Sequence, residues 1–398
     1  MRALFAPVSL TLAVQTLVAL AVYSAPVMAP VAGPGDFGVP ASWIGYYIAI
    51  VYLGSMLGSV AAGGLVARYG PVRMSQAGLA SCLIGLALAS SSFSLCVVAL
   101  GAFFVGLGYG PSTPASSQIL VRATPPSLLA ITFSVKQTGV PLGGAIAGAL
   151  VPTLILAFGW RWAAVANGLA CVLLAFSIQP MRKLYDTGLN KAAPISLRSA
   201  FAPLALVFRD RRLGEMAVTS FIFGGVQITL VAYLVTFLTE SFAMTLVLAG
   251  FVMAASQVAS VIGRVLWGVV ADRLLTRRAM LGLLGVGMGL SALVTLAATP
   301  AWPLPLLFLF AIVFGATAVG WNGVFLAEVA HIAPAGQASQ YTGGCMFFTF
   351  MGVVVSPPLF SQALAFGGSY AGAYAVFGVP AVLAGVWLLA VRPMTGPR

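Results

Sequence analysis

Residues 279–298 read AMLGLLGVGMGLSALVTLAA, twenty consecutive residues without a charged side chain. At 1.5 Å per residue a helix of this length spans about 30 Å, the thickness of the hydrocarbon core of a bilayer. The stretch does not alternate polar and apolar residues, as a strand of a membrane barrel would. It therefore predicts a helix that crosses a membrane.

Stretches of the same kind recur along the whole chain. Of its 398 residues 61% are hydrophobic and 7% are charged, against roughly a quarter charged in a soluble domain. The predicted fold class is therefore all-α and integral to the membrane, with twelve spans. They lie near 8–29, 43–66, 74–92, 95–120, 129–157, 160–180, 214–238, 244–270, 279–298, 304–330, 338–365 and 369–391.

The net charge of +12 comes from basic residues that gather on one side of these spans. With both termini in the cytoplasm, sixteen of the 19 Lys and Arg fall in cytoplasmic segments and only Arg161 in the opposite loops. This bias follows the positive-inside rule. The sequence thus predicts a multi-pass protein of the inner (plasma) membrane, with no nucleic-acid partner. Reading the first span as a cleaved signal peptide is disfavoured, because eleven spans would remain.

The chain divides into two similar halves. A polar interval at 181–213 separates predicted six-helix bundles at 1–180 and 214–398, and we interpret it as a cytoplasmic linker. Three pairs of segments match at offsets of 205 to 209 residues: GGLVAR at 63 with GVVADR at 268, Arg122 and Pro125 with His331 and Pro334, and LAFG at 156 with LAFG at 364. Their constant order and spacing predict an internal duplication, so the two bundles should be pseudo-symmetric.

These loop motifs resemble those of the major facilitator superfamily, and the resemblance covers the whole chain. The family's loop after the second span typically reads G-x-L-A-D-R-x-G-R-R. Gly63, Leu65, Arg68, Gly70 and Arg73 fit it here, but Ala67 replaces the acid, whereas the second copy keeps Gly268, Asp272, Arg273, Arg277 and Arg278. The resemblance implies a secondary transporter in which Asp272, Arg273, Arg277, Arg68 and Arg73 form cytoplasmic gating contacts.

A second, shorter resemblance concerns the eighth span. The segment GRVLWGVVADR, which starts at Gly263, is similar to the monocarboxylate and oxalate transporters of the superfamily. There an arginine eight residues before the loop acid, placed as Arg264 is before Asp272, meets the substrate carboxylate. The resemblance implies the same role for Arg264.

Lys136 and Arg264 are the two cations predicted inside apolar spans, roughly 9 to 12 Å from the cytoplasmic interface. A buried charge costs about 2.5 to 3.5 kcal/mol on insertion scales, so such residues are functional candidates. No Asp or Glu falls at mid-membrane by this placement. The alternative is that each side chain snorkels to the headgroups or pairs with a structural carboxylate. In the family these two helices meet, which implies that both cations flank one cavity and hold an anionic substrate.

Six uncharged residues are further candidates for the substrate site. Gln257 lies two turns before Arg264 on the same helical face, and the others lie on spans that line the family's cavity. These are Gln15, Tyr23, Gln227, Tyr233 and Asn322. Interhelical hydrogen bonding is an equal alternative for each. Glu328, at the end of the tenth span, is a candidate proton carrier.

The sequence lacks the catalytic and metal-binding residues of an enzyme and the phosphate-binding loop of an ATP-driven pump. It contains one histidine, four cysteines without CxxC spacing and no phosphate-binding loop, so neither a metal nor another cofactor is predicted. The sequence therefore predicts a monomeric carrier of a small organic anion, most simply a carboxylate, driven by proton symport or anion exchange. The alternatives are an efflux pump for amphipathic compounds, a membrane enzyme and an anion channel.

Overall fold

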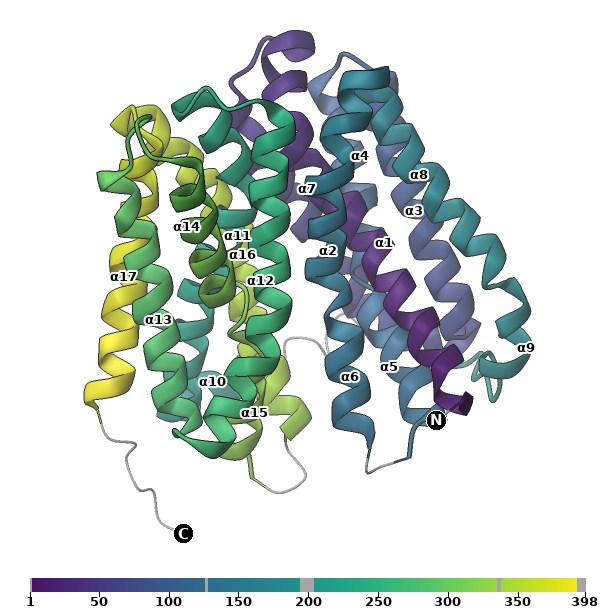
Figure 1. Cartoon of the computed structure of the whole chain (residues 1–398). Helices are drawn as coiled ribbons and strands as arrows, with labels where there is room; N and C mark the ends of the chain where they lie inside the picture. The colour runs from purple at the N-terminus through teal and green to yellow at the C-terminus, as the bar shows by residue number, and fades with distance from the viewer. Residues whose placement is uncertain (1, 126–127, 194–203, 335–337, 392–398) are drawn as a thin grey trace. The chain divides into compact units, whose positions relative to one another are not determined.

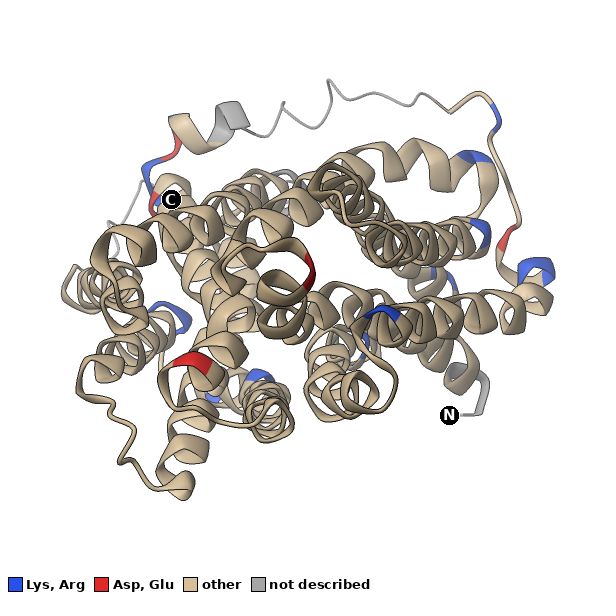
Figure 2. Ribbon diagram, turned by 90° about the horizontal axis from the view of Figure 1, so that it is seen from above, with Lys and Arg blue, Asp and Glu red and all other residues tan. Residues whose placement is uncertain are grey.

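The computed structural model describes residues 2–125, 128–193, 204–334 and 338–391, and within these ranges it is built of helices without strands. Twelve helical stretches are long and apolar enough to cross a membrane (Figure 1). They are Phe5–Phe37, Ala41–Tyr69, Pro71–Ser91, Leu95–Ala123, Thr132–Phe158, Trp160–Tyr185, Arg211–Ser241, Leu246–Arg273, Arg277–Ala297, Leu304–Ile332, Tyr341–Gly367 and Tyr370–Ala390. The predicted all-α membrane fold and its twelve spans are confirmed. Charged positions are sparse along these helices (Figure 2).

The chain forms two compact units, unit 1 (Met1–Leu197 with Thr245–Ala254) and unit 2 (Arg198–Met244 with Ala255–Arg398). The helices of unit 1 are α1 (Arg2–Ala32), α2 (Ile44–Tyr69), α3 (Pro71–Ser91), α4 (Leu95–Tyr109), α5 (Ser112–Ala123), α6 (Leu129–Gln137), α7 (Gly139–Phe158), α8 (Trp160–Ser177) and α9 (Arg182–Tyr185). Those of unit 2 are α10 (Leu204–Arg209), α11 (Arg211–Ser241), α13 (Arg277–Val294), α14 (Leu304–Ala318), α15 (Asn322–Ile332), α16 (Ala338–Gly367) and α17 (Tyr370–Ala390). Helix α12 (Leu246–Arg273) contributes to both.

Packing follows the same scheme inside each unit. In unit 1 the first span packs on the fifth (α1 on α7) and the third on the sixth (α3 on α8). In unit 2 the corresponding pairs are α11 on α16 and α13 on α17. The same pairing of equivalent spans is the arrangement that a duplicated six-helix bundle requires.

The fourth and tenth spans are each interrupted near the middle. Gly110 and Pro111 separate α4 from α5, and α15 begins at Asn322, 210 residues after the start of α5 at Ser112. The interruptions thus occupy equivalent places in the two halves. Broken helices are tolerated inside a membrane where neighbouring groups satisfy the freed backbone atoms, and here each break carries polar side chains into the interior of its unit.

The predicted linker at 181–213 is partly helical. After a short 3-10 turn at Gln179–Met181 the chain forms α9, and before the seventh span it forms α10. Helix α11 begins at Arg211, because the Asp210 side chain accepts hydrogen bonds from the backbone N–H groups of Arg212 (2.9 Å) and Leu213 (3.3 Å). This is an ordinary N-cap.

Candidate functional site

A polar cluster in unit 1 surrounds Lys136, which lies near the end of α6 and is 1% exposed. Its Nζ donates hydrogen bonds to Thr113 Oγ1 (3.1 Å) and to Gln137 Oε1 (3.3 Å). Gln15 of α1, also 1% exposed, accepts through Oε1 from Ser112 Oγ (3.2 Å) and Thr113 Oγ1 (3.5 Å). The start of α5 therefore links the two predicted residues Gln15 and Lys136.

The hydrogen-bond partners of Lys136 are neutral. In the described ranges the ion pairs are Arg161–Asp36, Arg182–Asp186, Arg277–Asp272 and Arg278–Glu215, and none includes Lys136. A hydroxyl and an amide oxygen orient the ammonium but leave its charge uncompensated. Such a group is suited to bind an anion.

A matching cluster in unit 2 is centred on Gln227 of α11. Its Oε1 accepts from Trp321 Nε1 (3.0 Å) and from Asn322 Nδ2 (3.0 Å) at the start of α15. In both units, therefore, a glutamine of the first span of its half accepts hydrogen bonds from the break in the fourth. The structure brings the predicted residues Gln227 and Asn322 together.

Two predicted residues lie along α12. Gln257 is 1% exposed, and neither amide atom has a hydrogen-bond partner in the part of the chain that the structure describes. Arg264 is half-buried. One turn further, Trp267 donates from Nε1 to the carbonyl oxygen of Ala316 on α14 (2.8 Å), which fixes this part of α12 beside the interrupted tenth span. A buried amide without partners is costly, so Gln257 remains a candidate for contact with a ligand.

The remaining candidates differ in their surroundings. Tyr23 is 2% exposed inside unit 1. Tyr233 donates its hydroxyl hydrogen to the carbonyl oxygen of Pro357 (2.6 Å) and stacks on Phe360 with a centroid distance of 4.1 Å, so its side chain is held against α16. Glu328 is half-buried on α15.

The loop between α12 and α13 carries the predicted gating residues of unit 2. Asp272 and Arg277 form an exposed ion pair of 3.4 Å, and Arg273 is exposed beside them. A tighter contact lies next to them. Glu215 of α11 receives Arg278 Nη1 at 2.7 Å and Trp387 Nε1 of α17 at 2.7 Å, so one carboxylate joins three helices.

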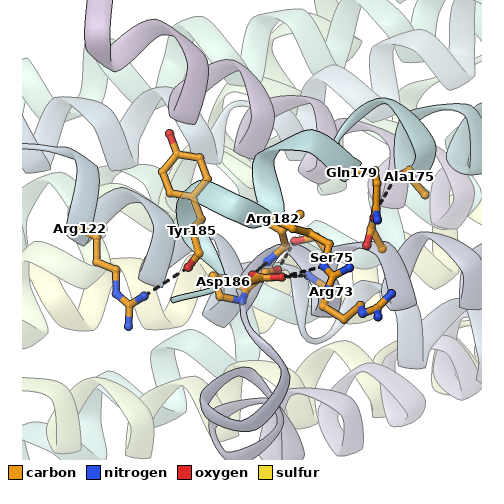
Figure 3. A network of polar contacts seen from close by, with 11 residues as sticks. Arg73, Ser75, Arg122, Ala175, Gln179, Arg182, Tyr185 and Asp186 are labelled. Carbon is orange, nitrogen blue, oxygen red and sulfur yellow. Dashed lines mark hydrogen bonds and ion pairs between the residues drawn. The ribbon is translucent and has the colours of Figure 1, made fainter. Parts of the chain in front are cut away.

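The equivalent loop of unit 1, between α2 and α3, receives its acid from elsewhere in the chain (Figure 3). Asp186, just after α9, accepts hydrogen bonds from the backbone N–H groups of Val72 (2.7 Å) and Arg73 (3.1 Å) at the start of α3. Its side chain is 4% exposed. Asp186 therefore supplies a carboxylate next to the position where Ala67 lacks one.

Further contacts fasten the same segment. Arg68 Nε donates to the carbonyl oxygen of Ala193 (2.6 Å), and Arg122 Nη1 donates to that of Thr187 (3.0 Å). The backbone N–H of Asn190 donates to the carbonyl oxygen of Ala67 (2.9 Å). We call residues 182–193 the clasp. The sequence did not point to it, because an acid 119 positions after Ala67 shows no local motif.

Twelve apolar spans in two units of the same internal packing, with polar side chains at paired helix breaks, define a membrane transporter of duplicated six-helix architecture. The profile of the Major Facilitator Superfamily matches residues 11–343, and the chain belongs to this family. It is therefore a transporter and not an enzyme.

Two curated relatives are similar over about three quarters of the chain. A probable sulfoacetate transporter of Cupriavidus necator is 25% identical over 77% of this chain and 75% of its own length. A hexuronate transporter of Bacillus subtilis is 22% identical over 78% of this chain and 76% of its own length.

Solved structures agree on the fold. A POT family transporter in complex with 5-aminolevulinic acid has a TM-score of 0.79 at 13% identity, covering 96% of this chain and 95% of that one. A D-xylose-proton symporter has a TM-score of 0.73 at 14% identity, covering 97% and 98%.

Proposed function

We propose that this protein carries a small organic anion across the membrane by alternating access, and that Arg264 and Lys136 bind the anion. Gln257, Gln15, Gln227 and Asn322 supply neutral hydrogen bonds around them, with Tyr23 and Tyr233 as further contacts. The substrate is an organic acid, most simply a carboxylate.

The observation that carries the proposal is the buried charge of Lys136, which has only neutral hydrogen-bond partners. An ammonium group that is 1% exposed, inside a membrane span, with hydrogen bonds only to neutral Thr113 and Gln137, has its charge balanced by no described residue. The free energy cost of such a charge is lowered when an anion binds. If Lys136 served only to fill space, an apolar side chain could fill the same space without the free energy cost of a buried charge.

The relatives support the class of substrate. Sulfoacetate and hexuronate, the compounds in their names, are both organic acids. Arginine can hold a carboxylate through two parallel hydrogen bonds, whereas lysine contributes a point charge. One residue of each kind suits an organic acid with one or two acidic groups.

The transport cycle is part of the proposal. Proton symport, with Glu328 or the substrate carrying the proton, or exchange of anions supplies the energy. Asp272, Arg273 and Arg277, and in the other half Arg68 and Arg73, form cytoplasmic gating contacts. The protein acts as a monomer in the inner (plasma) membrane with both termini in the cytoplasm.

Counterflow in proteoliposomes tests the proposal. Purified protein is reconstituted with an unlabelled organic acid inside, and uptake of the labelled acid is followed for a panel that includes sulfoacetate and a hexuronate. Saturable counterflow of at least one acid, lost in a Lys136→Gln/Arg264→Gln variant that still folds, is the expected result. Counterflow of an uncharged amphipathic compound without any acid would contradict it. Conductance far above carrier rates would indicate a channel.

A further inference from the structure

Unit 1 contains a cavity of about 420 Å³ at the end that carries Asp36 and Arg161. It is bordered by α1, α2, α3, α4 and α8 and by the connection from α1 to α2, all of which belong to this unit. Among the residues that the structure describes, none that lines it is charged. Its size is that of a small-molecule site, but its lining contains no group that would hold an anion.

Small side chains on four helices create the space. Ala29 of α1, Ala89 of α3, Ala99 of α4 and Ala164 of α8 all border the cavity. In membrane proteins small residues usually let two helices approach closely. Here the short side chains face an opening that they are too small to fill, and an unfilled apolar cavity destabilises the helices around it.

The mouth of the cavity carries the marks of a membrane interface. Trp43 and Leu95 line it and are 45% and 41% exposed. Trp160, also in the lining, donates from Nε1 to Asp36 Oδ2 (2.8 Å), which in turn pairs with Arg161 at 3.1 Å. Tryptophan beside charged groups is typical of the headgroup level of a bilayer. The apolar space therefore begins at the headgroups and continues toward the hydrocarbon.

We propose that this cavity binds one acyl chain of a bilayer phospholipid, whose headgroup lies at the level of Asp36 and Arg161. The occupant must be apolar along its length, because the lining offers no charge, and it must have a polar end, because the mouth is polar. Acyl chains surround every membrane-spanning helix, so they reach the exposed mouth without passing through water. The proposal is independent of the proposed transport substrate.

Tryptophan fluorescence provides a direct test, because two tryptophans of α8 differ in their surroundings. Trp160 lines the cavity and is 8% exposed, whereas Trp162 is 66% exposed and does not line it. Single-tryptophan proteins that keep one or the other are reconstituted into phospholipid with brominated acyl chains, which quench emission on contact. Bulk lipid reaches the exposed Trp162 but not the buried Trp160, so Trp160 is quenched only if an acyl chain enters the cavity. The expected result is strong quenching of both tryptophans.

Variants that fill the cavity complete the experiment. Ala29→Phe places a ring in the space and should abolish quenching of Trp160 while leaving that of Trp162 unchanged. Ala164→Leu, from the opposite wall, should act in the same direction if Ala29→Phe folds poorly. Val31→Phe is the matched control on α1, because Val31 is 40% exposed and lies outside the lining; it should change neither signal.

Three outcomes would overturn the proposal. The first is absence of Trp160 quenching in the unmodified cavity while Trp162 is quenched. The second is quenching of Trp160 that persists in both filled variants. The third is recovery of Trp160 emission in brominated lipid when an amphipathic solute without an acyl chain is added in an amount that leaves the quenching of Trp162 unchanged, since the cavity would then take that compound in preference to phospholipid.

Discussion

Arg264 is proposed to bind the substrate carboxylate through both arms of its guanidinium, and Arg264→Lys separates this role from simple charge balance. The variant keeps the charge but loses the planar fork. Binding of the acid should weaken by about 1.5 to 3 kcal/mol, roughly ten- to hundredfold in Kd. Calorimetry on detergent-purified protein measures it. Wild-type affinity in the variant would mean that Arg264 only snorkels or balances charge, because lysine does both.

Lys136 should affect binding and stability in opposite directions. Because its buried charge has neutral partners, Lys136→Gln should raise the melting temperature of the empty protein while weakening the binding of acids, and more strongly for dicarboxylates than for monocarboxylates. Thermal melts with and without ligand measure both effects. A fall in the melting temperature with unchanged affinity would instead indicate a structural lysine. Thr113→Val, which removes one hydrogen bond but no charge, is the milder companion variant.

Helix α3 is fastened by the clasp through the carboxylate of Asp186. Asp186→Ala removes the cap on Val72 and Arg73 and should destabilise the protein by about 0.5 to 2 kcal/mol, the usual range for a cap. Gly70→Ala should do the same, because its φ is +94° and a methyl group there would meet the Asp186 carboxylate. Because both changes disrupt the same contact, the double variant should lose less stability than the sum of the losses of the two single variants. Thermal melts of the three variants measure this.

Gly159 provides the matched control for Gly70. It also lies between two consecutive helices, its φ is +84°, and a methyl group there would have no neighbour within 4 Å. Gly159→Ala therefore carries the backbone strain without touching a carboxylate. We expect the stability losses of Gly159→Ala and Asp186→Ala to add in the double variant, and the losses of Gly70→Ala and Asp186→Ala not to add. Such a difference would show that Gly70→Ala acts through the contact with Asp186.

Asp272 tests the gating role in unit 2. Its pair with Arg277 is exposed, with 65% of the Asp272 side chain accessible, and an exposed pair contributes little to stability. Asp272→Asn should therefore leave expression and melting temperature near normal while favouring the inward-open state. Reactivity of single cysteines introduced beside Lys136 and Arg264, on the cytoplasmic side of these residues, measures that shift. Unchanged reactivity would assign the loop's function to the more buried contact of Arg278 with Glu215.

The membrane spans could be predicted from the sequence, whereas the breaks within them could not. Long uncharged stretches such as 279–298 identify spans because hydrocarbon tolerates little else. The breaks after Tyr109 and Ala318 were not predicted, since glycine and proline occur throughout these spans and only the tertiary contacts select which of them interrupt a helix. Lys136 was found because charge in a span is rare. Thr113 was missed because a hydroxyl in a span is common, although Gly110 and Pro111 before it favour a turn.

At the scale of the whole molecule, duplication has preserved the scaffold and diversified the charges. Gln15 and Gln227 occupy equivalent places, and each accepts hydrogen bonds from a helix break. The cations have no such symmetry. At the offset of 205 residues that relates the loop motifs, Arg264 corresponds to Ser59, whose Oγ donates to the carbonyl oxygen of Gly110 (2.8 Å). The neutral hydrogen bonds therefore belong to the architecture that the two halves share, whereas each of the two cations that we propose bind the anion is particular to one half.

The orientation of the whole chain rests on its charge distribution and is testable with two labels. Cys82, Cys171 and Cys345 are buried, so Cys96→Ser gives a background without exposed cysteine among the described residues. Gly35→Cys and Lys191→Cys then add one exposed site each, the first in the connection from α1 to α2 and the second in the clasp. A membrane-impermeant maleimide added to intact cells should label Cys at 35 and not at 191, because the positive-inside rule puts the basic clasp in the cytoplasm. Inverted membrane vesicles should give the opposite result. Labelling of both sites in intact cells would refute the twelve-span topology with cytoplasmic termini, since the five spans between residues 35 and 191 place the two sites on opposite sides of the membrane.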